Sequence, residues 1–377
     1  MKKTLIALAV LGAAAGVAHA QSNVTIYGVV DTGFIKKSGH DVEMGENVNN
    51  RLGFRGVEDL GSGMKATFEL ERRFDLNNGE AKNDKDWDGA ANVGLKSDTW
   101  GAVRLGRVNE LTTETIRKFD PFYQYGVANM IYGTQRMLHI DNTIRYDSPN
   151  WSGFHFGATY SLGGNTDKDS AEGTPIYTAK EAGNGYDNDG YGIMLGYDNG
   201  PLSLVGNWSR LADSKKSSVW NLGAAYRFGD AKVELLYQQT KDKAISRGGY
   251  TGLDVDALMA MSPDSVNKFF GADGKYANIA ELDSLNQKQW LLGLEWKLGP
   301  GRLNASAQWM EVEFAGTGIS DKDIYKYGIG YTYDLSKRTA IYGNVAYTDY
   351  DDEVVARTFG DADDSVTAVQ IGITHKF

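Results

Sequence analysis

Several arginines of this chain alternate with apolar residues, as they would on a wall with one charged and one apolar side. Arg51 and Arg55 flank Leu52 and Phe54. Neighbouring side chains of an extended strand point to opposite faces, so the two arginines should share the face away from these apolar side chains. A guanidinium group is permanently charged and can bind or steer ions. Four more arginines are candidates for the same charged surface: Arg104, Arg107, Arg136 and Arg145.

Carboxylates of a long connection, Val108–Leu138, are candidates for the opposite charge. These are Glu110, Glu114 and Asp120, and the pair Asp120-Pro121 indicates a turn. Facing arginines across a narrow aqueous gap, they would create a strong local field. They could equally accept hydrogen bonds from backbone amides and fix the shape of the connection. The arginines have a similar alternative, because a guanidinium group often pairs locally with a carboxylate in a purely structural role.

The sequence offers little for catalysis. The chain contains no Cys, which excludes disulfides, thiolate nucleophiles and Cys-based zinc sites. No His lies beside a Ser in a nucleophile motif, and no His-Glu-x-x-His sequence occurs. After the first twenty residues the chain has four His, which are His40, His139, His155 and His375. We therefore expect no enzyme and no cofactor.

Two acidic clusters offer oxygen ligands for a cation. They are Asp187-Asn188-Asp189-Gly190 and Asp254-Val255-Asp256. Neither has the twelve-residue spacing of a calcium loop. A metal-binding adhesin is thus a weak alternative, and we expect no dedicated metal site.

Alternation with a period of two positions the charged residues, and it recurs to the end of the chain. Segments of about ten residues suit a tilted crossing of a membrane, and Trp and Tyr gather near their ends. A soluble sandwich also alternates, but the polar faces here carry many charges, which a water-filled interior tolerates. The clearest alternating segments are Val24–Phe34, Met64–Arg73, Gln287–Leu298 and Val369–Phe377.

The connections between these segments alternate between short and long. The short ones are rich in turn residues and fall near 59–63, 97–101, 148–153, 199–201, 229–230, 299–301 and 335–337. The long polar ones fall near 35–49, 74–87, 108–138, 163–189, 211–217, 241–286, 313–322 and 349–364. Short periplasmic turns and long outer loops are typical of bacterial barrels. The pattern predicts an all-β, transmembrane antiparallel β-barrel of about sixteen strands, wide enough for an aqueous channel.

The first residues have the pattern of an export signal. Lys2 and Lys3 precede an uncharged apolar stretch, and Ala18-His19-Ala20 supplies small residues at the cleavage positions. We expect residues 1–20 to be a cleaved signal peptide and residues 21–377 to form one barrel domain. Without Lys2 and Lys3 the chain has 37 Lys and Arg against 49 Asp and Glu, a net charge of −12. Nucleic acid is an improbable partner for so acidic a surface.

The chain resembles the Gram-negative trimeric general porins from Gln21 to Phe377. The resemblance is carried by several sequence motifs in order: NVTIYGVVDTGF (23–34), RLGFRGVEDLGSGMKATFELE (51–71), VRLGR (103–107), NTIRYDSPNWSGFHFGATYS (142–161), YDNGPLSL (197–204), YDLSKRTAIYGNVAY (333–347) and the terminal GITHKF.

This resemblance implies a homotrimer of sixteen-stranded barrels in the outer membrane of a Gram-negative bacterium, surrounded by lipid and lipopolysaccharide. It also implies that the third loop, Val108–Leu138, folds into the lumen and narrows it. Arg51 and Arg107 coincide with arginines that the family uses at this constriction. The expected function is general diffusion of ions and small hydrophilic solutes.

The chain departs from the family pattern in two places. It lacks the Pro-Glu-Phe-like acidic tip of the third loop, and it has Gly89-Ala90 where many relatives carry arginine. Its outer loops are strongly acidic, as in 349–353 and 361–364, and negative potential at a channel mouth enriches cations. We therefore predict weak selectivity with a lean toward cations. A substrate-selective channel of the same fold is the alternative, which would show a row of aromatic residues along its lumen.

Overall fold

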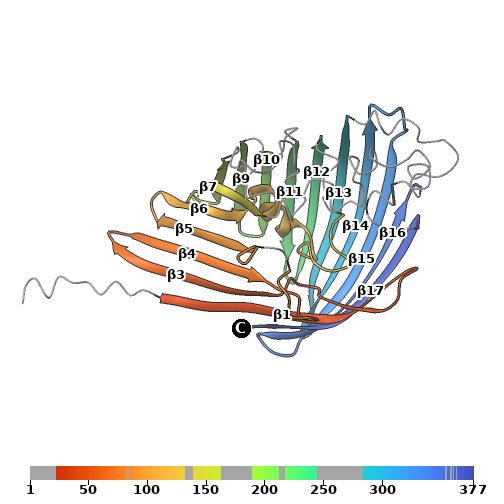
Figure 1. Ribbon diagram of the computed structural model, residues 1–377, viewed down its shortest axis with the longest axis horizontal. Coiled ribbons are helices and arrows are strands. Elements are labelled where there is room, and N and C mark those ends of the chain that lie inside the picture. The colour runs from red at the N-terminus through yellow and green to blue at the C-terminus, as the bar shows by residue number, and fades with distance from the viewer. Residues whose placement is uncertain are drawn as a thin grey trace, which may run out of the picture.

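The protein is a closed antiparallel β-barrel (Figure 1). The computed structural model describes residues 23–82, 85–131, 139–162, 189–211, 217–243, 283–352, 355–356, 359, 361 and 363–377. Its sheet contains sixteen long strands and the three-residue β2 within these residues. The predicted sixteen-stranded barrel is confirmed.

The strands follow the alternating segments of the sequence. They are β1 (Asn23–Lys37), β2 (Glu43–Gly45), β3 (Arg51–Gly61), β4 (Met64–Arg73), β5 (Ala90–Ser97), β6 (Gly101–Asn109), β7 (His139–Asp147), β8 (Phe154–Ser161), β9 (Gly190–Asn199), β10 (Leu202–Arg210), β11 (Ser218–Phe228), β12 (Ala231–Asp242), β13 (Ser284–Leu298), β14 (Gly301–Ala315), β15 (Lys322–Asp334), β16 (Thr339–Tyr350) and β17 (Ser365–Lys376). Two short helices, α2 (Leu111–Ile116) and η1 (Arg117–Phe119), lie between β6 and β7.

The barrel closes through β1, which pairs with β3 along its first half and with β17 along its second half. The backbone N–H of Gly28 donates to the carbonyl of Phe377 at 3.1 Å, so the chain end completes the ladder. Closure matters because an open sheet edge would leave backbone groups without partners in a membrane.

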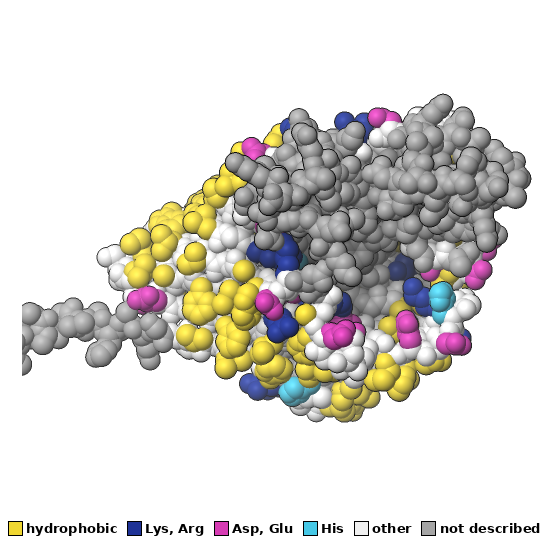
Figure 2. All heavy atoms as spheres, in the orientation of Figure 1, with side chains coloured by type: hydrophobic (Ala, Val, Ile, Leu, Met, Phe, Trp, Pro, Cys, Tyr) yellow, Lys and Arg dark blue, Asp and Glu magenta, His cyan; other side chains and the backbone are white. Residues whose placement is uncertain are grey.

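The two faces of the wall divide as the alternation predicts. Ile26, Leu195 and Ile371 are 60%, 69% and 55% exposed on the outer face. On the inner face, polar side chains such as Asn221 and Gln289 are almost fully buried. Figure 2 shows hydrophobic side chains spread over the left and lower outside of the wall. The outer face is therefore the apolar one.

In this antiparallel barrel the short turns that follow β9, β11 and β13 lie at the same end of the wall. Gly200, Gly229 and Gly299 occupy tight turns with φ of 56°, 59° and 60°, a left-handed backbone conformation that glycine adopts without steric cost. Of the helices in the described part of the chain, none combines the length and the apolar composition that a membrane crossing needs.

Aromatic residues are distributed unevenly around the outside. In the described strands, β1 to β7 carry no strongly exposed Tyr or Trp, whereas β8 to β16 carry many. The exposed side chains on that second part are Tyr160, Tyr191, Tyr226, Trp290, Trp296, Trp309, Tyr325, Tyr327, Tyr333 and Tyr347.

Candidate functional site

The connection between β6 and β7 is the central element of the site, and residues 110–131 of it are described. We call them the 110–131 segment. Glu110 caps its short helix, accepting the backbone N–H of Thr113 at 2.7 Å, as side chains at helix N-termini commonly do. The same carboxylate accepts the Ser209 hydroxyl of β10 at 2.7 Å. The cap thus ties the segment to the wall.

An apolar patch on the inner face of the wall receives the helix. Leu111, Ile116, Phe119 and Met130 of the segment pack in one buried cluster with wall residues. The wall residues of this cluster are Met194, Val205, Ala225, Leu236 and Leu291, from β9 to β13. The sequence carries a sign of this patch, because these apolar residues stand at positions where the alternation calls for polar ones.

Asp120 organises the turn of the segment. It is fully buried, and its carboxylate accepts the backbone N–H groups of Phe122 at 3.0 Å, Gln124 at 2.8 Å and Met130 at 3.0 Å. Burial raises the pKa of Asp120 above its ordinary value, although these three donors oppose the shift. Tyr123 and Gln124 have φ of 54° and 65°, a strained conformation for such residues that the carboxylate holds in place.

Beyond this turn the segment bonds to strands far away in the sequence. The Tyr123 hydroxyl donates to Glu295 of β13 at 2.7 Å. Burial, together with the charge of Glu295, raises the pKa of the phenol. The backbone N–H of Val127 donates to Gln370 of β17 at 3.2 Å. Two more hydrogen bonds join the segment to β14 and β15. The backbone N–H of Ile131 donates to Gln308 of β14 at 2.7 Å, and Lys326 of β15 donates to Asn129 at 3.0 Å.

Arg51, on β3, contacts the segment. Its guanidinium donates to the hydroxyl of Tyr125 at 3.0 Å and lies 3.9 Å from Glu71. Arg117 stands over the same phenol ring, 5.6 Å from its centre. Burial raises the pKa of Tyr125, but the cations of Arg51 and Arg117 outweigh it, and the net shift is downward.

The other predicted arginines on β6 and β7 are in ion pairs. Arg145 is only 4% exposed and reaches Glu114 of the segment at 2.5 Å and Asp147 at 2.8 Å. Arg104 pairs with the same Asp147 at 2.6 Å. These contacts match the structural alternative as well as the functional one, because each charge already has a partner.

Arg107 and Arg55 complete the described part of the predicted basic set. Arg107 lies 2.5 Å from Asp141 and donates to the Asp88 carbonyl at 2.8 Å. Arg55 stands over the ring of Tyr27, 5.2 Å from its centre, away from the segment's contacts. Arg136 lies outside the described residues.

The predicted acidic residues divide into two kinds. Glu114 faces an arginine across the site, whereas Glu110 and Asp120 bind backbone amides and hold the segment's shape. For Glu110 and Asp120 the geometry is therefore that of the structural alternative.

Sequence reasoning missed several charged residues at the site. Arg73 is buried between Glu71, at 3.4 Å, and His139, at 3.2 Å. Lys232 pairs with Glu234 and Glu295 and donates to the Lys118 carbonyl of the segment at 2.8 Å. Strand parity places these residues on the inner face, but only the tertiary structure shows that they meet the segment.

Within the described residues, no three His, Cys, Asp or Glu side chains are grouped closely enough to hold a metal ion. What the site offers is a set of fixed, mostly paired charges around a chain segment. Such an arrangement can select and slow passing ions, because opposed charges near a low-dielectric wall are weakly screened.

Comparison with known proteins gives consistent matches. A family model described as Gram-negative porin matches residues 7–353. An outer membrane porin protein of Bordetella pertussis is 33% identical to this chain, and outer membrane porin protein 32 of Delftia acidovorans is 32% identical. Both matches cover 100% of this chain and 100% of the relative.

Solved structures match the barrel as well. An anion-selective porin from Comamonas acidovorans has a TM-score of 0.69 and 25% identity, covering 95% of this chain and 100% of that one. The trimer form of OmpT from Vibrio cholerae has a TM-score of 0.63 at 14% identity, covering 94% of this chain and 99% of that one, and shares the fold.

Proposed function

This chain belongs to the Gram-negative porin family and is an outer-membrane channel, and on that premise we propose that it is a general-diffusion porin. It would pass ions and small hydrophilic solutes through a water-filled barrel, without enzyme activity or cofactor. Its neighbours would be outer-membrane lipid and lipopolysaccharide.

We further propose that the 110–131 segment narrows the channel. The observation that carries this proposal is the set of contacts from one short segment to β10, β13, β14, β15 and β17. All of these contacts use side chains on the face opposite to the exposed apolar one. A segment bonded to so many strands on that face would cross the water-filled interior.

The charges at the site support weak selectivity. Arg51, Arg107 and Arg145 each lie within 4 Å of a carboxylate, which cancels most of their field at a distance. The outer loops carry more acidic than basic residues in the sequence, and we propose a slight preference for cations. The name of the Comamonas acidovorans relative records anion selectivity for that protein. A reversal potential that shows strong anion preference would contradict our proposal.

A single cysteine tests the narrowing directly, because the chain has no Cys of its own. Lys118 lies exposed in the segment. With Lys118→Cys in a planar bilayer, a bulky charged methanethiosulfonate reagent should reduce the single-channel current. Val345→Cys, on the outer face of β16, is the matched control and should not respond. If Lys118→Cys conducts and reacts with the reagent without any change in current, the segment does not narrow the path.

The substrate-selective alternative makes a different prediction in the same apparatus. One solute would then block the current saturably at millimolar concentration, while chemically related solutes would not. General diffusion predicts that block is weak and similar for solutes of equal size and charge.

We also propose that the outer face of β1 to β7 meets other copies of the chain in a homotrimer. The described strands β1 to β7 carry no strongly exposed Tyr or Trp of their own, whereas such residues elsewhere mark the boundary between lipid and water. The exposed Trp87 near this face comes from the connection before β5 and packs against Phe54 of β3. Val93 of β5 and Ile193 of β9 are each 57% exposed. Val93→Trp should dissociate the trimer on a semi-native gel and Ile193→Trp should not. Intact trimers with Val93→Trp would place the interface elsewhere.

A further inference from the structure

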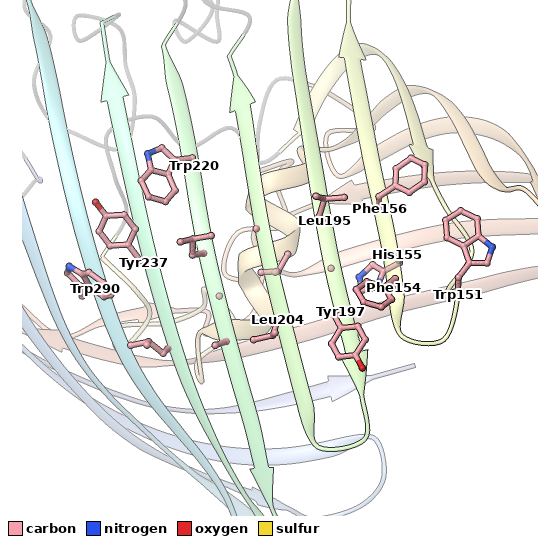
Figure 3. Close-up of a pocket in the computed structure, with 17 residues that line it drawn as sticks. Trp151, Phe154, His155, Phe156, Leu195, Tyr197, Leu204, Trp220, Tyr237 and Trp290 are labelled. Atoms are coloured by element: carbon pink, nitrogen blue, oxygen red, sulfur yellow. The ribbon is translucent and has the colours of Figure 1, made fainter.

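The outer face of β8 to β13 contains a groove with a volume of about 850 Å³ (Figure 3). Its walls include Phe154 and Phe156 of β8, Leu195 of β9 and Leu235 of β12. Nearly all of its lining is apolar or aromatic, and several of these side chains are strongly exposed on the outside of the barrel. The groove is therefore part of the surface that the outer membrane covers.

Two small residues form the floor of the groove. Gly206 of β10 lies opposite Leu222, and Ala224 of β11 lies opposite Leu204. A Cβ atom added at Gly206 would meet only one heavy atom within 4 Å, a methyl of Leu222 at 3.4 Å. The depression thus exists because side chains are missing there, and a larger side chain has room to fill it.

Aromatic rings close the groove toward the long loops. Trp220 and Tyr237 lie 4.9 Å apart between ring centres, and Tyr237 and Trp290 lie 4.5 Å apart. Trp208 is the cross-strand partner of Trp220 and continues the row to Tyr191, at 5.6 Å. Figure 3 shows Trp220, Tyr237 and Trp290 side by side on neighbouring strands.

The opposite end, toward the short turns, has a gap in its aromatic rim. Phe154 and Tyr197 stack at 4.5 Å on one side of it. On the other side of the gap, the aromatic residue near the short turns is Tyr226 of β11. Between Tyr197 and Tyr226, the outer face of β10 presents only Leu202 and Leu204. Short turns face the periplasm in bacterial barrels, so the groove opens toward the periplasmic leaflet.

We propose that this groove seats an acyl chain of a glycerophospholipid from the periplasmic leaflet. The lining is almost entirely apolar or aromatic and offers mainly dispersion contacts, which suits a hydrocarbon chain. The gap between Tyr197 and Tyr226 lets the chain enter, and the stacked rings stop it at the far end. The inference depends on the membrane position of the barrel and not on what the channel conducts.

Two alanine-to-leucine substitutions provide a matched test. Ala224 lines the groove, whereas Ala307 lies on the outer face of β14 outside it. The full mature chain and both variants are reconstituted in vesicles of phosphatidylethanolamine and lipopolysaccharide, extracted in mild detergent and weighed by native mass spectrometry. We expect the wild type and Ala307→Leu to retain one phosphatidylethanolamine per chain, and Ala224→Leu to lose it.

Other outcomes overturn the proposal. These are equal retention by the two variants, no retained phospholipid on the wild type, retained lipopolysaccharide that Ala224→Leu removes, or association of chains that Ala224→Leu abolishes. If Ala224→Leu does not fold, Gly206→Leu replaces it, because its new side chain has open space. Unchanged single-channel current in a variant that has lost its lipid separates this inference from the proposed channel function.

Discussion

Two inner walls hold the 110–131 segment in different ways. The first, which we call the neutral wall, comprises the inner side chains of β9 to β13 that lie beneath α2. The ion-paired Lys232, Glu234 and Glu295, near the short-turn ends of β12 and β13, also contact the segment but are not part of this wall. The neutral wall offers apolar contacts and an amide ladder in which Asn221 donates to Asn207 and Gln238 donates to Asn221, each at 2.7 Å.

The second, the charged wall, comprises the inner side chains of β3 to β7. It meets the segment with arginines, because Arg51 donates to Tyr125 and Arg145 pairs with Glu114 of the segment.

The neutral wall and the charged wall therefore serve different purposes: one positions the segment and the other acts on passing ions. Apolar packing and buried amide bonds depend little on salt, so the neutral wall can fix the segment's position under changing conditions. Charges act over a longer range, and those of the charged wall can influence an ion that does not touch them. Substitutions on the neutral wall or in the segment's own frame should therefore change stability, and substitutions on the charged wall should change selectivity.

The largest effect is expected from Asp120→Ala. The substitution leaves three buried backbone N–H groups without their acceptor, and each such loss costs about 1–3 kcal/mol. We expect the segment to lose roughly 4 kcal/mol of ordering free energy in total. Limited proteolysis should then cut it in the folded barrel. Asp98→Ala, in the exposed turn after β5, is the control. A segment that stays protease-resistant would refute the role given to Asp120.

A slightly smaller effect is expected from Leu291→Ala on the neutral wall. Leu291 is fully buried beneath the segment, and removing such a side chain costs about 3 kcal/mol through lost burial and the cavity left behind. The denaturation midpoint in detergent reports the loss. Leu292→Ala is the matched control, since Leu292 is the next residue, 55% exposed on the outer face. Equal losses for the two variants would contradict the buried contact.

Arg51→Glu on the charged wall should alter selectivity, and it should also lower stability because the new carboxylate lies beside Glu71. Replacing a cation by an anion beside Tyr125 should raise the cation-to-anion permeability ratio by roughly threefold at low salt and less at high salt. Reversal potentials under a salt gradient measure this ratio. Arg72→Glu makes the same charge change on the next strand, where Arg72 is exposed. Should both variants shift the ratio equally, Arg51 has no special position.

The smallest effect is a pH dependence that originates at Tyr125. The pKa of its phenol is lowered from the ordinary value of about 10. Raising the pH through this lowered pKa adds a negative charge between Arg51 and Arg117, so the cation preference should increase on the alkaline side. Tyr125→Phe should remove this alkaline increase and leave the cation-to-anion permeability ratio near neutral pH unchanged. A titration that persists in Tyr125→Phe comes from another group.

The segment's own helix shows how far local rules reach. Asp120-Pro121 indicates the turn, and the sequence allows Glu110 to accept a backbone N–H group, but it predicts no helix at 111–116 because Glu is not among the favoured N-cap residues. The partners of Tyr123 and Ile131 are not visible in the sequence. They lie 172 and 177 residues away, and no local spacing relates them.

The sequence by itself determined the strands, their two faces and the alternation of short turns with long loops. Side chains of an extended chain alternate with a period of two whatever the surroundings, so the apolar set of Leu292 and the polar set of Gln289 separate without a structure. The tertiary structure decided which charges meet. Closing the barrel brings Arg51 to Tyr125 and Arg145 to Glu114, because the pairing of sixteen strands and the path of one segment set those distances together.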